Sequence, residues 1–131
     1  MKITADTNLL VRALAEDDAR QGRLAQAELA RADLVALTLP TLCELVWVLS
    51  QANEIPTADI AEAIRRLING ANVVVNRPAV EAGLAMLEAG GDFTDGVIAY
   101  EGRWLGAETF VTFDKQAAKL MRTRHEAVRL L

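Results

Sequence analysis

The sequence predicts an α/β protein with three layers, α/β/α, built on a central, mostly parallel sheet of about five short strands. Apolar runs of strand length alternate with amphipathic helical patterns along the chain. Parallel neighbours in a sheet need helical crossovers, and such crossovers place helices on both faces. Because no repeat, low-complexity tract or linker interrupts the pattern, residues 1–131 are expected to form a single domain.

The expected strands are short and mostly apolar, and they lie at residues 3–5, 34–37, 73–75, 109–112 and 128–131. A helix over residues 20–32 follows the capping pair Asp17 and Asp18. Thr57 is expected to cap the next amphipathic helix, which stops at Asn69 and Gly70.

Two further helices are expected in the second half of the chain. The first opens at Pro78, buries Val80 and Leu84, and ends at Gly90. The second begins near Thr94. These helices separate the third expected strand from the fourth, as an α/β fold requires.

Composition excludes several classes of protein. No apolar run approaches the ~20 residues of a membrane span. The chain enters a strand pattern at Lys2 and Ile3, so we expect no secretory signal. Cys43 is the single cysteine, which excludes an internal disulfide and suits a reducing cytoplasm. We therefore expect a cytoplasmic protein with no membrane association.

The net charge of −4 argues against broad, sequence-blind binding of nucleic acid, which usually relies on a basic field. It is compatible with catalysis on RNA. An acidic balance also fits a cluster of metal ligands or a surface for a basic partner.

Four carboxylates occupy informative positions. Asp6 and Asp114 each end an expected strand, where ligands bind in open α/β sheets. Glu44 is the only charge in an apolar helix and is expected to be buried, whereas Asp95 opens another apolar helix. If the four converged, each pair about 4 Å apart would repel by roughly 4 kcal/mol, so a cation would be needed. Oxygen ligands without histidine or cysteine favour Mg²⁺ or Mn²⁺.

Helix capping is the alternative explanation for each acid. Asp6 and Asp114 are placed to cap the helices that follow them. Thr41-x-x-Glu44 matches a capping box, and Asp92-x-x-Asp95 approximates one. No single acid distinguishes capping from metal binding.

Taken together, the order Asp6-x-Asn8, Glu44, Asp95 and Asp114 resembles the acidic quartet of PIN-domain nucleases, and the short chain resembles the VapC toxin branch. The resemblance covers nearly the whole chain. It implies that the four acids hold a divalent metal.

The same resemblance suggests supporting roles for neighbouring residues. Asn8 resembles the side chain that orients the first acid or a bound water, and Thr112 is a candidate for positioning Asp114. Asp92 either adds a fifth acid or only caps its helix. Gly96 departs from relatives, which commonly have alanine there, and weakens the helix start by at most about 1 kcal/mol.

The implied function is a Mg²⁺-dependent endoribonuclease that hydrolyses RNA phosphodiester bonds as the toxin of a type II toxin–antitoxin pair. Members of this family usually form homodimers and are silenced by an antitoxin whose basic segment covers the acidic cleft. The chemistry needs no side-chain nucleophile. His125 lies in a basic stretch and is assigned no role.

Other side chains have an ordinary explanation beside a functional one. Trp47 and Trp104 are expected in the core or a dimer interface rather than as platforms for bases. Several cations either flank the acidic pocket and hold phosphates or belong to a solvated face. They are Arg12, Lys115, Lys119 and Arg122.

Two other classes of function remain open. A catalytically silent PIN-like module would bind RNA or protein and use its acids only as caps. A metal-dependent nuclease or phosphatase with another substrate would share the metal chemistry. Dinucleotide binding is disfavoured because the sequence has neither G-x-G-x-x-G after the first strand nor a P-loop.

Overall fold

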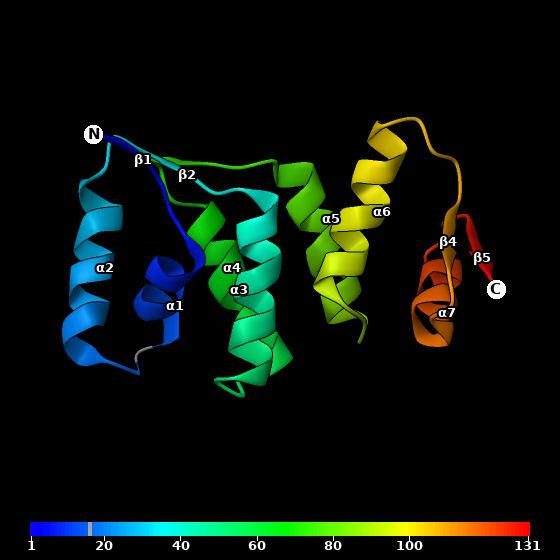
Figure 1. Ribbon diagram of the computed structural model, residues 1–131, viewed down its shortest axis with the longest axis horizontal. Helices are drawn as coiled ribbons and strands as arrows, with labels where there is room; N and C mark the ends of the chain where they lie inside the picture. The colour runs from blue at the N-terminus through cyan, green and yellow to red at the C-terminus, as the bar shows by residue number, and fades with distance from the viewer. Residues whose placement is uncertain (16) are drawn as a thin grey trace. The chain divides into compact units, whose positions relative to one another are not determined.

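The computed structural model describes residues 1–15 and 17–131. Their contacts gather into two compact units, unit 1 (Met1–Asn76) and unit 2 (Arg77–Leu131). Both units combine short parallel strands with helices (Figure 1).

Unit 1 carries a parallel three-stranded sheet in the order β1-β2-β3. Its register pairs Ile3 with Val35 and Val35 with Val73. Two helices lie between consecutive strands in the chain, which gives each parallel pair its helical crossover. The elements are β1 (Lys2–Thr4), α1 (Thr7–Ala15), α2 (Ala19–Arg31), β2 (Leu34–Ala36), α3 (Leu39–Gln51), α4 (Thr57–Ile68) and β3 (Val73–Val74).

The helix starts of unit 1 follow local chemistry. The Asp18 carboxylate accepts a hydrogen bond from the Gln21 backbone N–H at 3.0 Å and caps α2, as predicted. Thr57 is the first residue of α4 and follows Pro56 as the N-cap, so the prediction that Thr57 caps this helix is wrong. Proline with a fixed φ can precede a helix without supplying a side-chain cap.

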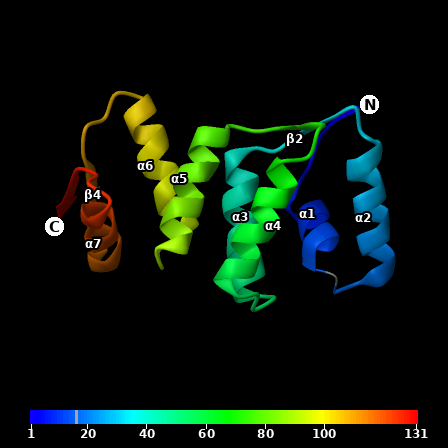
Figure 2. The ribbon, with the colours of Figure 1, turned by 180° about the vertical axis from the view of Figure 1, so that it is seen from behind.

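Unit 2 carries the parallel pair β4–β5, in which Phe110 is paired with Val128. Helices α5 and α6 lie side by side (Figures 1 and 2). A core of Met86, Ala99 and Met121 joins α5, α6 and α7 and packs against both strands. The elements are α5 (Arg77–Glu88), α6 (Phe93–Trp104), β4 (Phe110–Thr112), α7 (Lys115–Thr123) and β5 (Val128–Leu130).

Gly96 makes the close approach of α5 and α6 possible. A Cβ atom at this position would lie 2.4 Å from the carbonyl oxygen of Ala82, which is backbone and cannot move aside cheaply. Gly83 faces the same contact, because a Cβ there would lie 2.7 Å from the ring of Phe93. Gly96 is therefore a packing requirement of this helix pair, whereas sequence reasoning identified only its weak helix propensity.

The α/β class predicted from the sequence is confirmed, with parallel pairing throughout the described strands and helices between them, consistent with a three-layer α/β/α fold. Each strand lies within one residue of its predicted bounds. The strands are short, from two to three residues. Among the described helices, none combines the length and apolar character that crossing a bilayer requires.

Candidate functional site

Asp6 lies between β1 and α1. Its Oδ1 atom accepts a hydrogen bond from the Leu9 backbone N–H at 2.9 Å, and its carbonyl oxygen accepts one from the Leu10 N–H at 3.3 Å. Ala5, which precedes it, is fully buried, whereas Asp6 is exposed. The carboxylate therefore caps the helix with Oδ1 while Oδ2 is available for a second interaction.

Glu44 lies on the exposed side of α3, and the prediction that it is buried is wrong. The buried residues Leu42, Leu45 and Leu49 recur with helical spacing on the opposite side. The helix is therefore amphipathic, although its composition is mostly apolar.

The capping-box interpretation of Thr41 and Glu44 is also wrong. The N-cap of α3 is Thr38, so Thr41 and Glu44 both lie inside the helix. The Thr38 hydroxyl donates a hydrogen bond to the Thr41 hydroxyl at 2.9 Å. Glu44 is thus not needed at the helix start.

A cavity of about 240 Å³ in unit 1 brings Asp6, Asn8 and Glu44 together. Thr7, Pro40 and Thr41 complete its lining. The acidic and amide side chains supply only oxygen and nitrogen atoms, and the cavity has no histidine or cysteine in its lining. This set of donors suits a hard divalent cation such as Mg²⁺ or Mn²⁺ better than zinc.

In unit 2, Asp95 lies at the start of α6, within electrostatic range of Asp92 and Asp114. Asp92 caps the helix by accepting a hydrogen bond from the Thr94 N–H at 3.0 Å. Asp95 lies in the first turn and is half-buried. Burial raises the pKa of the Asp95 carboxyl above its ordinary value, and the negative charges of Asp92 and Asp114 raise this pKa further. The crowding of negative charge at Asp95 is what a bound cation would relieve.

Asp114 joins β4 to α7 in the same way that Asp6 joins β1 to α1. Its Oδ1 atom accepts a hydrogen bond from the Ala117 N–H at 3.0 Å and caps α7. The Thr112 hydroxyl accepts a hydrogen bond from the Asp114 N–H at 2.9 Å, which fixes the backbone at the acid. Thr112 therefore contacts the residue that it was expected to position.

The candidate acids thus form one set in each unit. Asp6 and Glu44 line one cavity in unit 1. In unit 2, the charges of Asp92 and Asp114 add to the effect of burial on the pKa of Asp95. Across residues 1–15 and 17–131, no three acidic, histidine or cysteine side chains meet in an arrangement that holds a metal by itself. A single centre made from all four predicted ligands stays a prediction.

The cations and tryptophans considered as flanking groups are mostly exposed. The Arg12 guanidinium is paired with Asp17 at 3.1 Å, so its charge is already compensated. Lys115, Lys119 and Arg122 lie on the exposed side of α7, and their contact with RNA stays a prediction. Trp47 and Trp104 are 64% and 82% exposed, so neither belongs to the core, and their place in a dimer interface stays a prediction.

Sequence reasoning missed Thr7, Pro40 and Thr41 as parts of the cavity. Thr41 lies one turn before Glu44, and this spacing places both side chains on one side of a helix. The position one helical turn before Glu44 therefore identifies Thr41 as a neighbour of its side chain.

The PIN domain family model matches residues 3–122, a span that includes every candidate acid and most of both units. No curated protein matches the sequence. The acids at the ends of β1 and β4 and in α3 and α6 lie within this matched span. The chain belongs to the PIN domain family.

Proposed function

We propose that residues 1–131 act as one nuclease domain that hydrolyses RNA phosphodiester bonds with Mg²⁺ or Mn²⁺ held by Asp6, Glu44, Asp95 and Asp114. PIN domains are generally metal-dependent nucleases, and PIN nucleases bind RNA. The observation that carries the proposal is the family match over residues 3–122 on a chain that places an acid two residues after β1 and another two residues after β4.

The local chemistry of the acids supports this function. Capping uses Oδ1 of Asp6 and Oδ1 of Asp114, and each carboxylate has a second oxygen for a cation. Burial raises the pKa of the Asp95 carboxyl and the negative charges of Asp92 and Asp114 raise it further, so a nearby cation would favour the ionised form. A bound divalent ion would activate water and stabilise the negative charge that develops on the phosphate.

Asn8 and Thr112 would orient the metal-binding acids. Asn8 lines the cavity of Asp6 and Glu44, and its amide can hold a water or the Asp6 carboxylate by hydrogen bonds. Thr112 holds the backbone N–H of Asp114. Such contacts would restrict the acids before substrate binds, which is the usual role of groups that surround metal ligands.

The test uses the purified full chain with single-stranded RNA, single-stranded DNA and p-nitrophenyl phosphate. Wild type is compared with Asp6→Asn and with Glu101→Gln, an exposed acid of α6, in Mg²⁺, in Mn²⁺ and in chelator. We expect metal-dependent cleavage of RNA by wild type and Glu101→Gln only. Hydrolysis of DNA or the phosphatase substrate instead would identify a different metal-dependent hydrolase.

Metal binding has a readout that does not need activity. Mg²⁺ or Mn²⁺ should raise the Tm of wild type in proportion to the logarithm of metal concentration, because a ligand that binds the folded state stabilises it. Asp6→Asn should reduce this shift. Equal melting with and without metal, together with no cleavage, would leave a silent binding module as the function.

We further propose that the chain is the toxin of a type II toxin–antitoxin pair, acts in the cytoplasm and forms a homodimer. The net charge of −4 supports a basic antitoxin as partner. Induced expression should arrest growth of host cells, and Asp6→Asn should restore growth. Light scattering of the purified chain tests the dimer, and a monomer at micromolar concentration would contradict it.

A further inference from the structure

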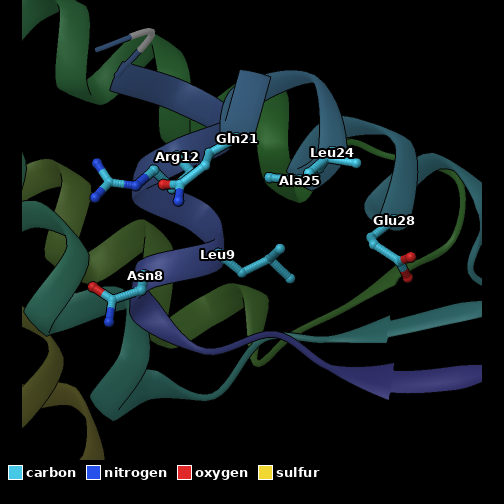
Figure 3. A pocket seen from close by; sticks show the side chains of 7 residues that line it. All are labelled: Asn8, Leu9, Arg12, Gln21, Leu24, Ala25 and Glu28. Carbon is cyan, nitrogen blue, oxygen red and sulfur yellow. The ribbon is translucent and has the colours of Figure 1, made fainter. Parts of the chain in front are cut away.

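A second cavity of unit 1, the α1–α2 hollow, has a volume of about 520 Å³ and lies between the two helices after β1 (Figure 3). The helices approach closely at Gly22, where a Cβ atom would lie 3.1 Å from the carbonyl oxygen of Arg12. Leu9, Leu24 and Ala25 provide its apolar lining. Leu24 is 56% exposed, so the hollow leaves apolar surface open to solvent.

The charges at the rim of the hollow are compensated by neighbours. Arg12 is paired with Asp17, with distances of 3.1 and 3.2 Å from Nη1 to the two carboxylate oxygens. Glu28 is paired with Arg31 one turn along α2. A phosphate would have to compete with Asp17 for Arg12 and would also face Glu28. The hollow therefore favours a neutral ligand.

The other polar groups at the rim are the side-chain amides of Asn8 and Gln21. Each amide offers both a donor and an acceptor. A flat, uncharged group with apolar faces and alternating donors and acceptors on its edge matches this lining. Nucleobases have this chemistry, and proteins that read single-stranded RNA bind unstacked bases by their faces and edges.

Asn8 also connects the hollow with the candidate site, because it lines both the hollow and the cavity of Asp6 and Glu44. We propose that the α1–α2 hollow binds a nucleobase of the RNA strand whose backbone lies at the Asp6–Glu44 cavity. This inference rests on the proposed function. It adds a subsite formed by Leu9, Gln21 and Leu24.

The test measures nucleoside binding without metal. The full chain in chelator is titrated with adenosine, guanosine, cytidine and uridine, and with ribose 5-phosphate as a ligand without a base, while ¹H–¹⁵N NMR follows the amides of α1 and α2. At least one nucleoside should shift the Gln21 side-chain amide and the Leu24 and Ala25 backbone amides in a saturable way. Ribose 5-phosphate should leave these signals in place.

Variants of two exposed lining residues test the contacts. Gln21→Ala and Leu24→Ser should each raise the Kd for that nucleoside by at least about fivefold, the lower end of what a good base contact contributes. Gln51→Ala and Leu105→Ser change exposed residues outside the lining and should leave the Kd unchanged. Because all four positions are exposed, the variants should fold, and their amide spectra check this directly.

The outcomes separate this inference from the proposed function. Absence of saturable binding, or equal shifts with ribose 5-phosphate, overturns the nucleobase subsite even if RNA is cleaved with Mg²⁺. If the same amide signals move on dilution without ligand, a second copy of the chain occupies the hollow and the inference fails. Nucleoside binding without cleavage under either metal overturns the proposed function and the assignment to an RNA substrate.

Discussion

Asp6 and Glu44 line one cavity, although Asp6 lies between β1 and α1 and Glu44 lies on α3, beyond the next strand. The parallel pairing of β1 with β2 explains the meeting, because the segments that follow parallel strands emerge at the same edge of a sheet. In unit 2, Asp95 of α6 is likewise within electrostatic range of Asp114, which lies between β4 and α7.

Replacing Asp6 or Asp114 separates the role of each carboxylate as a helix cap from its role as a metal ligand. Asparagine caps a helix about as well as aspartate, so Asp6→Asn and Asp114→Asn should keep the stability of wild type in chelator, whereas the alanine variants should lose about 1 kcal/mol each. All four variants should lose RNA cleavage by at least about 100-fold, the upper end of what is lost when partners of metal ligands are replaced. Urea unfolding and cleavage assays measure the two effects, and wild-type cleavage by the asparagine variants would contradict a ligand role.

The raised pKa of Asp95 predicts how stability depends on pH in chelator. The folded state keeps the Asp95 proton above the ordinary pKa of 3.8, so this group favours folding at low pH and its contribution is lost as pH rises through the raised pKa. Near neutral pH the ionised carboxylate is destabilising, and Asp95→Asn should raise the Tm. The gain should shrink as pH falls toward the ordinary pKa.

Glu101→Gln on the same helix is the matched control for this experiment, because Glu101 is exposed. Its Tm difference from wild type should not follow the pH dependence of Asp95→Asn. Addition of Mg²⁺ should stabilise wild type more than Asp95→Asn. A Tm of Asp95→Asn below that of wild type, in chelator at neutral pH, would show that the ionised Asp95 carboxylate does not destabilise the folded state.

Gly96→Ala tests the contact between α5 and α6. Although alanine favours helices over glycine, the added Cβ would meet the Ala82 carbonyl at 2.4 Å, and we expect a loss of about 1–3 kcal/mol. Gly102→Ala on the same helix has its nearest contact at 4.0 Å and should instead gain up to about 1 kcal/mol. Thermal unfolding in chelator compares the two, and stabilisation by both substitutions would contradict the close approach.

Thr112→Val tests the hydrogen bond at Asp114. Valine keeps the branched shape and removes the acceptor of the Asp114 N–H, so stability should fall by about 1 kcal/mol and metal affinity by about tenfold. Thr112→Ser keeps a hydroxyl and should restore the affinity. Calorimetric titration with Mn²⁺ measures it, and equal affinities for the valine and serine variants would remove the positioning role.

The strands could be predicted from sequence because each is a short β-branched or apolar run between polar breaks, as at residues 34–36. The caps Asp18 and Asp114 could be predicted for a similar reason, since the chemistry of an N-cap is local. These features depend on a few neighbouring residues.

The features that sequence reasoning missed depend on contacts between distant segments. The apolar composition of α3 predicts that Glu44 is buried, but the helix packs against α1 and α4 and buries the side that carries Leu42, Leu45 and Leu49. The need for Gly96 arises at Ala82 on another helix. The family resemblance names two acids in each compact unit as metal ligands, and this role stays a prediction.

Asp6 and Asp114 each use one carboxylate oxygen to hold a backbone amide at the beginning of a helix. A side chain tied in this way has few rotamers left, so the main chain itself helps to set the direction of its other oxygen. A small chain can thus orient two carboxylates without many supporting side chains. Most surface positions of these helices can therefore vary in sequence while the direction of both charges is preserved.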